Sequence, residues 1–243
     1  MTALRSFLFI LALWAWTLVL GILFLPALAG PRGLAVAAAR FWLRGVFVFL
    51  RALCGLTYEV RGAVPKGAAL VASKHQSTFE TFAFRLILDD PAVILKRELL
   101  RIPIFGWYLG KSGVIAIDRA AGTKALKAMV KGAEQAKADG RQVLIFPEGH
   151  RMAVGEAPDY HTGVAMLYGA LDLPCVPVAI NSGLFWGRGG LAKRPGTVVV
   201  EFLEPIAPGL DRKAFMAELQ SRVEAGTARL VEEARARYPH LPR

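Results

Sequence analysis

The sequence predicts an α/β fold with a mixed sheet flanked by helices, preceded by an N-terminal membrane-associated helical region. From residue 56 onward, short apolar runs typical of strands alternate with segments typical of helices. Before that point, residues 7–29 carry no charged residue, and hydrophobic residues make up 54% of the 243-residue chain. We therefore expect a membrane anchor over residues 1–55 and an α/β domain over residues 56–243.

The charge-free segment is long enough to span a bilayer, which takes about 20 apolar residues in a helix. A signal peptide is the alternative, because residues 27–30 resemble a small-residue cleavage site. Against it, the apolar run is longer than a usual signal core, and only Arg5 precedes it. The arginines that follow it are Arg32, Arg40, Arg44 and Arg51. Since basic flanks tend to be cytoplasmic, we expect the rest of the chain on that side.

Residues 34–53 are predicted to form an amphipathic helix lying in the membrane interface. Arg40, Arg44 and Arg51 share one face of such a helix and would reach towards lipid headgroups. The opposite face carries Phe41, Trp42, Val46 and Phe49. Together with the first segment this helix can also form a hairpin in one leaflet, and a buried core helix is the alternative interpretation.

The strands of the domain are predicted from alternating or uninterrupted apolar runs bounded by turn residues. A Pro-Lys-Gly turn separates the first two. In chain order they cover residues 56–62, 68–73, 92–96, 113–117, 142–146, 175–180 and 197–203.

Helices are predicted between these strands from apolar periodicity and capping residues. They cover residues 78–88, 97–110 with a break at Pro103, 123–140, 162–171, and a final helix capped by Asp211 that runs towards Tyr238. Residues 183–196, rich in Gly, Arg and Lys, are predicted to be a loop.

Charge and cysteine content narrow the class of partner. The chain has 30 Lys and Arg against 19 Asp and Glu, a net charge of +11, which suits nucleic acid, an anionic membrane surface or acidic substrates. No nucleic-acid-binding motif or aromatic-basic platform is recognised, so nucleic acid is disfavoured. The cysteines, Cys54 and Cys175, form no disulfide framework, which favours a reducing compartment. The four histidines are scattered, so no metal is expected.

His75 and Glu80, in the stretch SKHQSTFETF, have two interpretations. Ser77 with Glu80 three positions later fits a capping box, which explains both residues without any function. Alternatively, Glu80 hydrogen-bonds one ring nitrogen of His75 and leaves the other as a general base. The two interpretations are compatible.

Three more stretches of interest lie within an apolar strand or directly after one. They are VIAIDR (residues 114–119), FPEGHR (residues 146–151) and VPVAI (residues 176–180). Each has a plain alternative: Asp118 as a helix cap, Pro-Glu-Gly as a turn with a solvated Arg151, and a buried strand with a proline. Ligands of open α/β sheets gather at the carboxyl ends of strands, which favours a shared site.

These four stretches, in this order, resemble the blocks of the glycerolipid acyltransferase family, the 1-acylglycerol-3-phosphate acyltransferases and their relatives. The matching residues are His75 and Glu80 in the first block, Arg119 in the second, Phe146, Pro147, Glu148, Gly149 and Arg151 in the third, and Pro177 in the fourth. The resemblance covers roughly residues 56–205, and four ordered blocks make it specific. Two positions depart from the pattern: Glu80 stands where aspartate is commoner, and His150 replaces the usual threonine. His161, near the third block, is either a solvated loop residue or a contact on the substrate side.

The resemblance implies a membrane-bound enzyme of phospholipid synthesis. It would transfer an acyl chain from acyl-CoA or an acyl carrier protein thioester to the sn-2 hydroxyl of 1-acylglycerol 3-phosphate, giving phosphatidic acid. His75 would be the base and Glu80 its orienting partner, with no metal or cofactor. Arg119 and Arg151 would bind the phosphate, Glu148 and Gly149 would shape that pocket, and Pro177 would belong to the acyl or substrate pocket.

Other acceptors, glycerol 3-phosphate or a lyso-ornithine lipid, fit the same blocks. A basic membrane-surface binding protein without catalysis is an alternative of another class. The expected location is the cell membrane, a bacterial inner membrane, with the catalytic domain on its cytoplasmic side.

Overall fold

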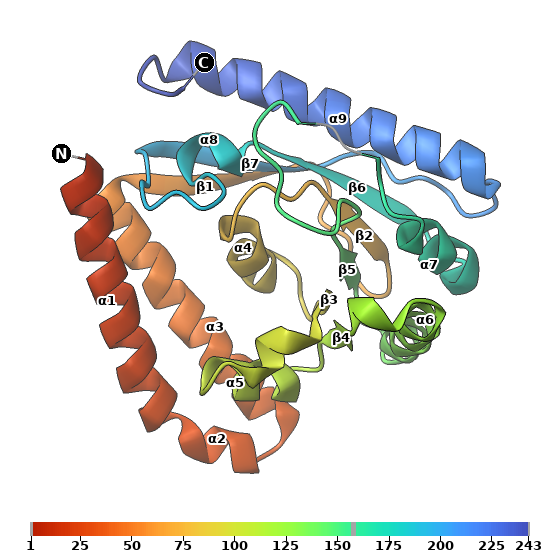
Figure 1. Ribbon diagram of the computed structural model, residues 1–243, viewed down its shortest axis with the longest axis horizontal. Coiled ribbons are helices and arrows are strands. Elements are labelled where there is room, and N and C mark those ends of the chain that lie inside the picture. Colours follow the sequence, from red (N-terminus) through yellow and green to blue (C-terminus); the bar gives the residue numbers. More distant parts are fainter. Residues whose placement is uncertain (1, 157–158, 243) are drawn as a thin grey trace.

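A seven-stranded sheet forms the centre of the structure, a computed structural model that describes residues 2–156 and 159–242 (Figure 1). Its strands lie in the order β1-β7-β6-β2-β5-β3-β4. They are β1 (Leu56–Arg61), β2 (Leu70–Ser73), β3 (Ala92–Lys96), β4 (Ile115–Ile117), β5 (Val143–Ile145), β6 (Cys175–Ile180) and β7 (Gly196–Phe202).

The sheet is mixed, as predicted. Strands β6, β2, β5, β3 and β4 all run in one direction, with Val71 opposite Leu144 and Val176 in the parallel registers on its two sides. Strand β7 is antiparallel to β6, and β1 is parallel to β7. The carboxyl ends of five neighbouring strands therefore share one edge, where ligands of α/β sheets bind.

Helices cover both faces of the sheet (Figure 1). In the domain they are α4 (Phe79–Ile87), α5 (Phe105–Lys111), α6 (Thr123–Ala138), α7 (Gly163–Leu171), α8 (Ser182–Phe185) and α9 (Arg212–Arg237), with 3-10 turns η2 (Arg97–Arg101) and η3 (Arg119–Ala121). Asp211 caps α9 as expected, accepting hydrogen bonds from the backbone N–H groups of Lys213 and Ala214.

Alternation along the strands divides the core into two clusters. Leu70 and Ala72 of β2 pack with α6, α7 and the first half of α9 on one face. Val71, between them, packs on the other face with α4 and with buried residues of the N-terminal helices. Successive side chains of a strand point to opposite faces, so a short buried strand serves both clusters.

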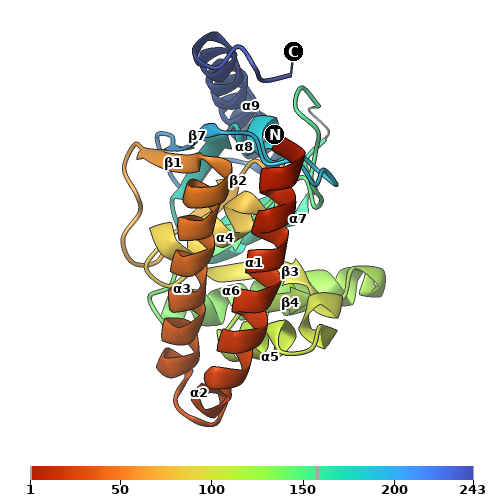
Figure 2. The same ribbon diagram turned by 90° about the vertical axis from the view of Figure 1, so that its left-hand side faces the viewer.

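Residues 2–54 form a helical hairpin that packs on the α4 face. Helices α1 (Thr2–Leu23) and α3 (Arg32–Phe49) lie side by side and are joined by the short α2 (Leu25–Ala29), and α3 continues into the π-turn η1 (Leu50–Cys54) (Figure 2). The indole N–H of Trp16 donates to the carbonyl of Trp42, and the indole N–H of Trp42 donates to the hydroxyl of Thr17, both over 3.0 Å. These bonds hold the two helices in register.

Helix α1 and the continuous segment of α3 and η1 are both long and apolar enough to cross a membrane. In each, 22% of the most apolar stretch of 18 residues is buried inside the protein. Many large apolar side chains of the hairpin are exposed: on α1 they are Leu4, Phe7, Leu8, Leu11, Trp14, Leu18, Val19, Ile22 and Leu23, and on α3 they include Leu34, Phe41 and Val48.

Three details differ from the sequence prediction. Arg40 does not reach towards lipid headgroups: its guanidinium donates to the carbonyls of Leu86, Leu88 and Asp89, because the end of α4 leaves these acceptors unpaired beside α3. Residues 97–110 form a 3-10 turn and a separate short helix rather than one broken α-helix. The predicted loop over residues 183–196 begins within α8.

Candidate active site

The residues of the candidate site follow the strands whose carboxyl ends meet at one edge. His75 comes after β2, Arg119 after β4, Glu148 after β5 and Ser182 after β6. The topology thereby brings together segments that lie more than a hundred residues apart in the chain. Of these four residues, Ser182 was not singled out from the sequence.

His75 is held by contacts on its ring and on its backbone. Its Nδ1 lies 2.9 Å from Glu80 Oε1. The ring stacks on Phe146, with centroids 4.1 Å apart and planes at 20°. The side chain is 15% exposed, so the imidazole is enclosed but accessible from solvent. When Nδ1 carries the proton that Glu80 accepts, Nε2 keeps a free lone pair and can act as a base.

The carboxylate of Glu80 is fully buried and surrounded by donors. Besides the His75 ring, Oε1 accepts the backbone N–H groups of Gln76 and Ser77 over 2.6 and 2.5 Å. The other oxygen, Oε2, accepts the hydroxyl of Ser182 over 2.7 Å. Burial of a carboxylate is costly unless such bonds compensate, so the loop before α4 and the start of α8 are both tied to this one group.

Glu80 therefore makes the contacts of both sequence interpretations. It caps the start of α4 by accepting the Ser77 N–H, and it contacts the His75 ring. The serine half of the box differs from the prediction, because α4 begins at Phe79 with Thr78 as N-cap. The Ser77 hydroxyl accepts the N–H of Phe79, two positions on, over 3.1 Å rather than that of Glu80.

A buried ion cluster lies behind His75. The ammonium of Lys74, which is 1% exposed, lies 2.5 Å from Glu148 Oε1 and 2.8 Å from Glu224 Oε1 of α9. It also donates to the carbonyl of Glu156 over 2.9 Å, and the hydroxyl of Tyr160 donates to Glu224 over 2.7 Å. No sequence motif pointed to Lys74 or Glu224, because their partners are distant in the chain.

Glu148 links this ion cluster to the backbone of His75. Its Oε2 accepts the backbone N–H of His75 over 2.7 Å, while Oε1 pairs with Lys74. Burial raises the pKa of the Glu148 carboxyl, and the hydrogen bond and charge of Lys74 oppose that rise. Both carboxylate oxygens are engaged inside the protein, so Glu148 shapes the site by holding the backbone of His75.

Gly149 lies in a backbone conformation that strains other residues, close to the side chains of His161 and Arg119. It lies in a turn with φ of 71°, and a Cβ at this position would lie 2.6 Å from Cδ2 of His161. The same point is 3.9 Å from Nη1 of Arg119, so Arg119, Gly149 and His161 lie close together. Glycine adopts this backbone conformation without strain, and a larger residue would also displace the exposed His161 ring.

The remaining predicted residues lie at different depths. Arg119 and Arg151 are both exposed, and Arg151 donates to the Thr78 hydroxyl over 2.9 Å, which places it beside the start of α4. His150 is exposed as well. Pro177 is buried in β6 between β2 and β7, where its carbonyl accepts the N–H of Leu203. Its place in an acyl or substrate pocket stays a prediction.

Among the described residues, no three His, Cys, Asp or Glu side chains come together as a metal site requires. The arrangement instead offers an imidazole with one nitrogen engaged by a buried carboxylate and the other free. Such a pair can remove a proton from a hydroxyl and so activate it as a nucleophile.

Comparison with known proteins agrees with this class of chemistry. Residues 56–181 match the acyltransferase family, and that span includes His75, Arg119, Glu148 and Pro177. The chain belongs to the acyltransferase family.

Curated relatives extend the similarity along the chain. The chain is 36% identical over 235 residues to a 1-acyl-sn-glycerol-3-phosphate acyltransferase of Pseudomonas aeruginosa, covering 95% of this chain and 91% of that protein. A protein of the same name from Escherichia coli is 30% identical over 166 residues, covering 66% of this chain and 67% of that protein. The yeast protein of that name, from Saccharomyces cerevisiae, is 30% identical over 181 residues, with 72% and 59% covered.

The fold is shared with a crystal structure of the 1-acyl-sn-glycerophosphate (LPA) acyltransferase PlsC from Thermotoga maritima. The TM-score is 0.75 at 20% sequence identity, and the superposition covers 95% of this chain and 99% of that one. The shared fold includes the region of the N-terminal hairpin, since nearly all of both chains is covered.

The ion cluster behind His75 generates a stability prediction. Lys74→Met should lower the free energy of unfolding by about 3–5 kcal/mol, because it leaves the buried Glu148 and the partly buried Glu224 without their cation. Thermal and denaturant unfolding in a non-ionic detergent would measure this. The matched control is Lys66→Met: Lys66 is exposed and pairs with Asp89 at 3.1 Å, so its loss should cost no more than about 1 kcal/mol. Similar losses at the two positions would contradict the cluster's structural role.

Proposed function

We propose that the protein is a membrane-bound 1-acylglycerol-3-phosphate O-acyltransferase. It transfers an acyl chain from a thioester of coenzyme A or acyl carrier protein to the sn-2 hydroxyl of the acceptor, giving phosphatidic acid. The relatives of that name support the acceptor. The observation that carries the chemistry is the contact between His75 Nδ1 and the buried Glu80 carboxylate.

In the proposed reaction, His75 Nε2 takes the proton of the acceptor hydroxyl as its oxygen attacks the thioester carbonyl. Glu80 holds the ring by Nδ1 and stabilises the imidazolium that forms. The tetrahedral intermediate then collapses, the carbon–sulfur bond breaks, and the leaving sulfur takes the proton from His75. The products are an ester and a free thiol, so neither a covalent enzyme intermediate nor a cofactor is needed.

The exposed arginines support recognition of the acceptor's phosphate. Arg151 lies beside Thr78, three residues after His75, and Arg119 lies beside the Gly149 turn. Within the described parts of the chain, Arg119 makes no hydrogen bond or ion pair, so its guanidinium is free for a ligand. Guanidinium groups bind phosphate with two parallel hydrogen bonds.

The hairpin supports the membrane part of the proposal. It exposes large apolar residues along both α1 and α3, and Ile102, directly after η2, and Trp107 of α5 add exposed apolar side chains. Contiguous apolar surface of this kind marks a contact with membrane or partner. With basic residues following the first helix, we place the catalytic domain on the cytoplasmic face of the cell membrane.

The function is tested by acyl transfer with the purified protein. Wild type should acylate 1-acylglycerol 3-phosphate with release of free thiol, and His75→Ala should abolish turnover while leaving the protein in the membrane fraction, because the base is lost but the hairpin is intact. His240→Ala is the matched control, since His240 is exposed and bonds to the carbonyl of Pro195. Near-wild-type turnover of His75→Ala would remove the catalytic assignment.

Arg119 and Arg151 can each be tested for binding to the acceptor's phosphate. If Arg119 or Arg151 binds it, replacement by alanine should lower kcat/KM about 10- to 150-fold with 1-acylglycerol 3-phosphate, the range expected for a charge-assisted contact. The same variant should change kcat/KM little with a monoacylglycerol, which has no phosphate. Comparing kcat/KM of the wild type and of each variant on both acceptors isolates the interaction between that arginine and the phosphate. Equal losses on both acceptors would assign the arginine a structural role and favour an acceptor without phosphate.

A further inference from the structure

Ser182 bonds to the oxygen of Glu80 that does not contact His75. It lies two positions after β6, opens α8 and is fully buried. Its hydroxyl donates to Oε2 of Glu80 over 2.7 Å, while Oε1 lies 2.9 Å from Nδ1 of His75. A path of direct contacts thus runs from the end of β6 through Ser182 and the carboxylate to the imidazole.

The two oxygens of the Glu80 carboxylate differ in their number of donors. Oε1 faces the His75 ring and accepts the backbone N–H groups of Gln76 and Ser77. Across residues 2–156 and 159–242, the hydroxyl of Ser182 is the one donor to Oε2. The terminal torsion of a glutamate side chain has a broad energy minimum, so donors on one oxygen leave the carboxylate free to turn about them. A donor on the second oxygen fixes its plane.

The position of Ser182 is itself fixed by hydrogen bonds before and after it. The side chain of the buried Asn181 donates to the carbonyl of Leu230 in α9 over 3.2 Å. Its amide oxygen accepts the N–H of Val199 in β7 over 2.9 Å. On the other side, the carbonyl of Ser182 accepts the N–H of Trp186 over 2.9 Å, which closes the single turn of α8. Ser182 is therefore attached to β7 and α9 independently of Glu80.

The next residue, Gly183, brings α8 directly against the loop that carries His75. Its N–H donates to the side-chain oxygen of Gln76 over 3.1 Å. A Cβ on Gly183 would lie 3.1 Å from Cβ of Gln76 and 2.8 Å from Cγ2 of Val154, closer than such atoms normally approach. The start of α8 therefore contacts both the loop and the carboxylate that orient the imidazole.

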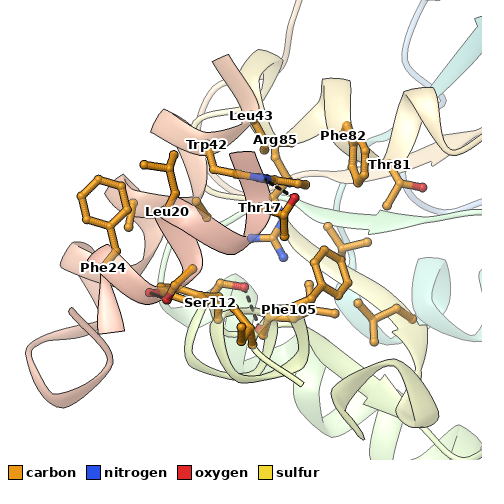
Figure 3. A pocket seen from close by; sticks show the side chains of 18 residues that line it. Thr17, Leu20, Phe24, Trp42, Leu43, Thr81, Phe82, Arg85, Phe105 and Ser112 are labelled. Carbon is orange, nitrogen blue, oxygen red and sulfur yellow. Dashed lines mark hydrogen bonds between the residues drawn. The ribbon is translucent and has the colours of Figure 1, made fainter. Parts of the chain in front are cut away.

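The helix that carries Glu80 is packed less completely on another side. Thr81, Phe82 and Arg85 of α4 line an apolar cavity of about 100 Å³ (Figure 3). Protein interiors are normally close-packed, and this packing holds each element in place. Next to the cavity that constraint on α4 is weaker, so the hydrogen bonds of Glu80 carry more of the positioning.

We propose that Ser182 is a positioning residue for acyl transfer, which holds the Glu80 carboxylate in the orientation that presents Oε1 to Nδ1 of His75. The inference rests on the proposed function, in which His75 is the base. Ser182 acts through Glu80 and exchanges no proton with the substrates. It also gives the fourth apolar stretch of the sequence a task at the site, because β6 delivers the serine to the carboxylate.

The orientation matters because it decides which ring nitrogen carries the proton. When Oε1 of Glu80 accepts the proton on Nδ1 of His75, the lone pair of Nε2 is free to act as a base. A carboxylate that turns away allows the other neutral tautomer, whose Nε2 already holds a proton and cannot take one from a hydroxyl. Loss of Ser182 should therefore slow the chemical step, whereas a serine with a purely structural role would affect stability alone.

The kinetic experiment uses the full chain in nanodiscs of zwitterionic lipid, with 1-acylglycerol 3-phosphate as acceptor. Ser182→Ala should lower kcat at least ~10-fold, the effect of losing a hydrogen bond to a charged group. KM for both substrates should stay within about 2-fold of wild type, because the lost contact acts on the transition state and not on substrate binding. The melting temperature of each variant is recorded, so that kcat is compared among folded proteins.

Ser112→Ala is the matched control. The hydroxyl of Ser112 is also buried and donates to the carbonyl of Leu109 over 2.7 Å. Ser112 precedes β4, so it lies at the opposite edge of the sheet from the carboxyl ends of the strands. Its loss should leave kcat at the wild-type value, which separates Ser182 from a general effect of removing a buried hydroxyl.

A double-mutant cycle tests whether Ser182 acts through Glu80. In the Glu80→Gln background the charge that stabilises the imidazolium is already lost, so adding Ser182→Ala should lower kcat by less than about 2-fold. A structural serine would instead lower kcat by the same factor in both backgrounds.

Nuclear magnetic resonance of protein labelled with ¹⁵N-histidine gives a test that needs no turnover. The signals of His75 are assigned by their loss in His75→Ala, and spectra are recorded at a pH where the ring is neutral. Wild type and Ser112→Ala should show one tautomer, with a slowly exchanging proton on Nδ1. Ser182→Ala should show a mixture of both tautomers and faster exchange of that proton with water.

Three results would overturn the inference: near-wild-type kcat for Ser182→Ala, equal losses in the two backgrounds of the cycle, or a His75 spectrum that Ser182→Ala leaves unchanged. Failure of the proposed function gives a different result. In that case the wild type transfers no acyl chain, while the His75 spectra still decide whether Ser182 orients the imidazole through Glu80.

Discussion

The buried carboxylate of Glu80 is the group on which the geometry of the site depends. It joins three pieces of chain that would otherwise be independent: the loop carrying His75, the first turn of α4, and Ser182 at the start of α8. A carboxylate in this position requires its donors, since unpaired charge inside a protein is costly. The same requirement fixes one nitrogen of the imidazole and leaves the other available.

A second buried charge constrains His75 from behind. Lys74 attaches the strand end to α9 through Glu224 and to the loop after β5 through Glu148, which in turn accepts the N–H of His75. The ring is thus positioned by Glu80 and Phe146, and the backbone by Glu148. Preorganisation of this kind is what a general base needs, because a small displacement of the reacting group costs much of its effect.

The sequence predicted the order of strands and helices, and the mixed sheet, because alternation and turn residues are local signals. It also placed His75 and Glu80 together, since five residues across a strand–helix turn are within reach of one another. Lys74 and Ser182 were missed for the opposite reason: their partners, Glu224 and Glu80, lie 150 and 102 positions away in sequence. Such pairs exist only once the topology has formed.

The contacts of the hairpin arginines could not be predicted from sequence either. Their spacing predicted one polar face towards lipid headgroups, yet Arg40 binds the carbonyl groups at the end of α4. Amphipathic periodicity tells which residues share a face but not whether protein or membrane lies against it. The phosphate-binding roles of Arg119 and Arg151, and the boundary between anchor and domain at residue 55, remain proposals drawn from the sequence.

The most direct test of the account is the pair of variants Glu80→Gln and Glu80→Ala, measured for both kcat and melting temperature. Glutamine can still accept the N–H groups of Gln76 and Ser77 but cannot stabilise an imidazolium by charge. We expect Glu80→Gln to melt close to wild type while kcat falls at least ~100-fold, the lower range for losing acid–base assistance. A fully active Glu80→Gln together with a destabilised Glu80→Ala would contradict it, and would leave Glu80 as a helix cap alone.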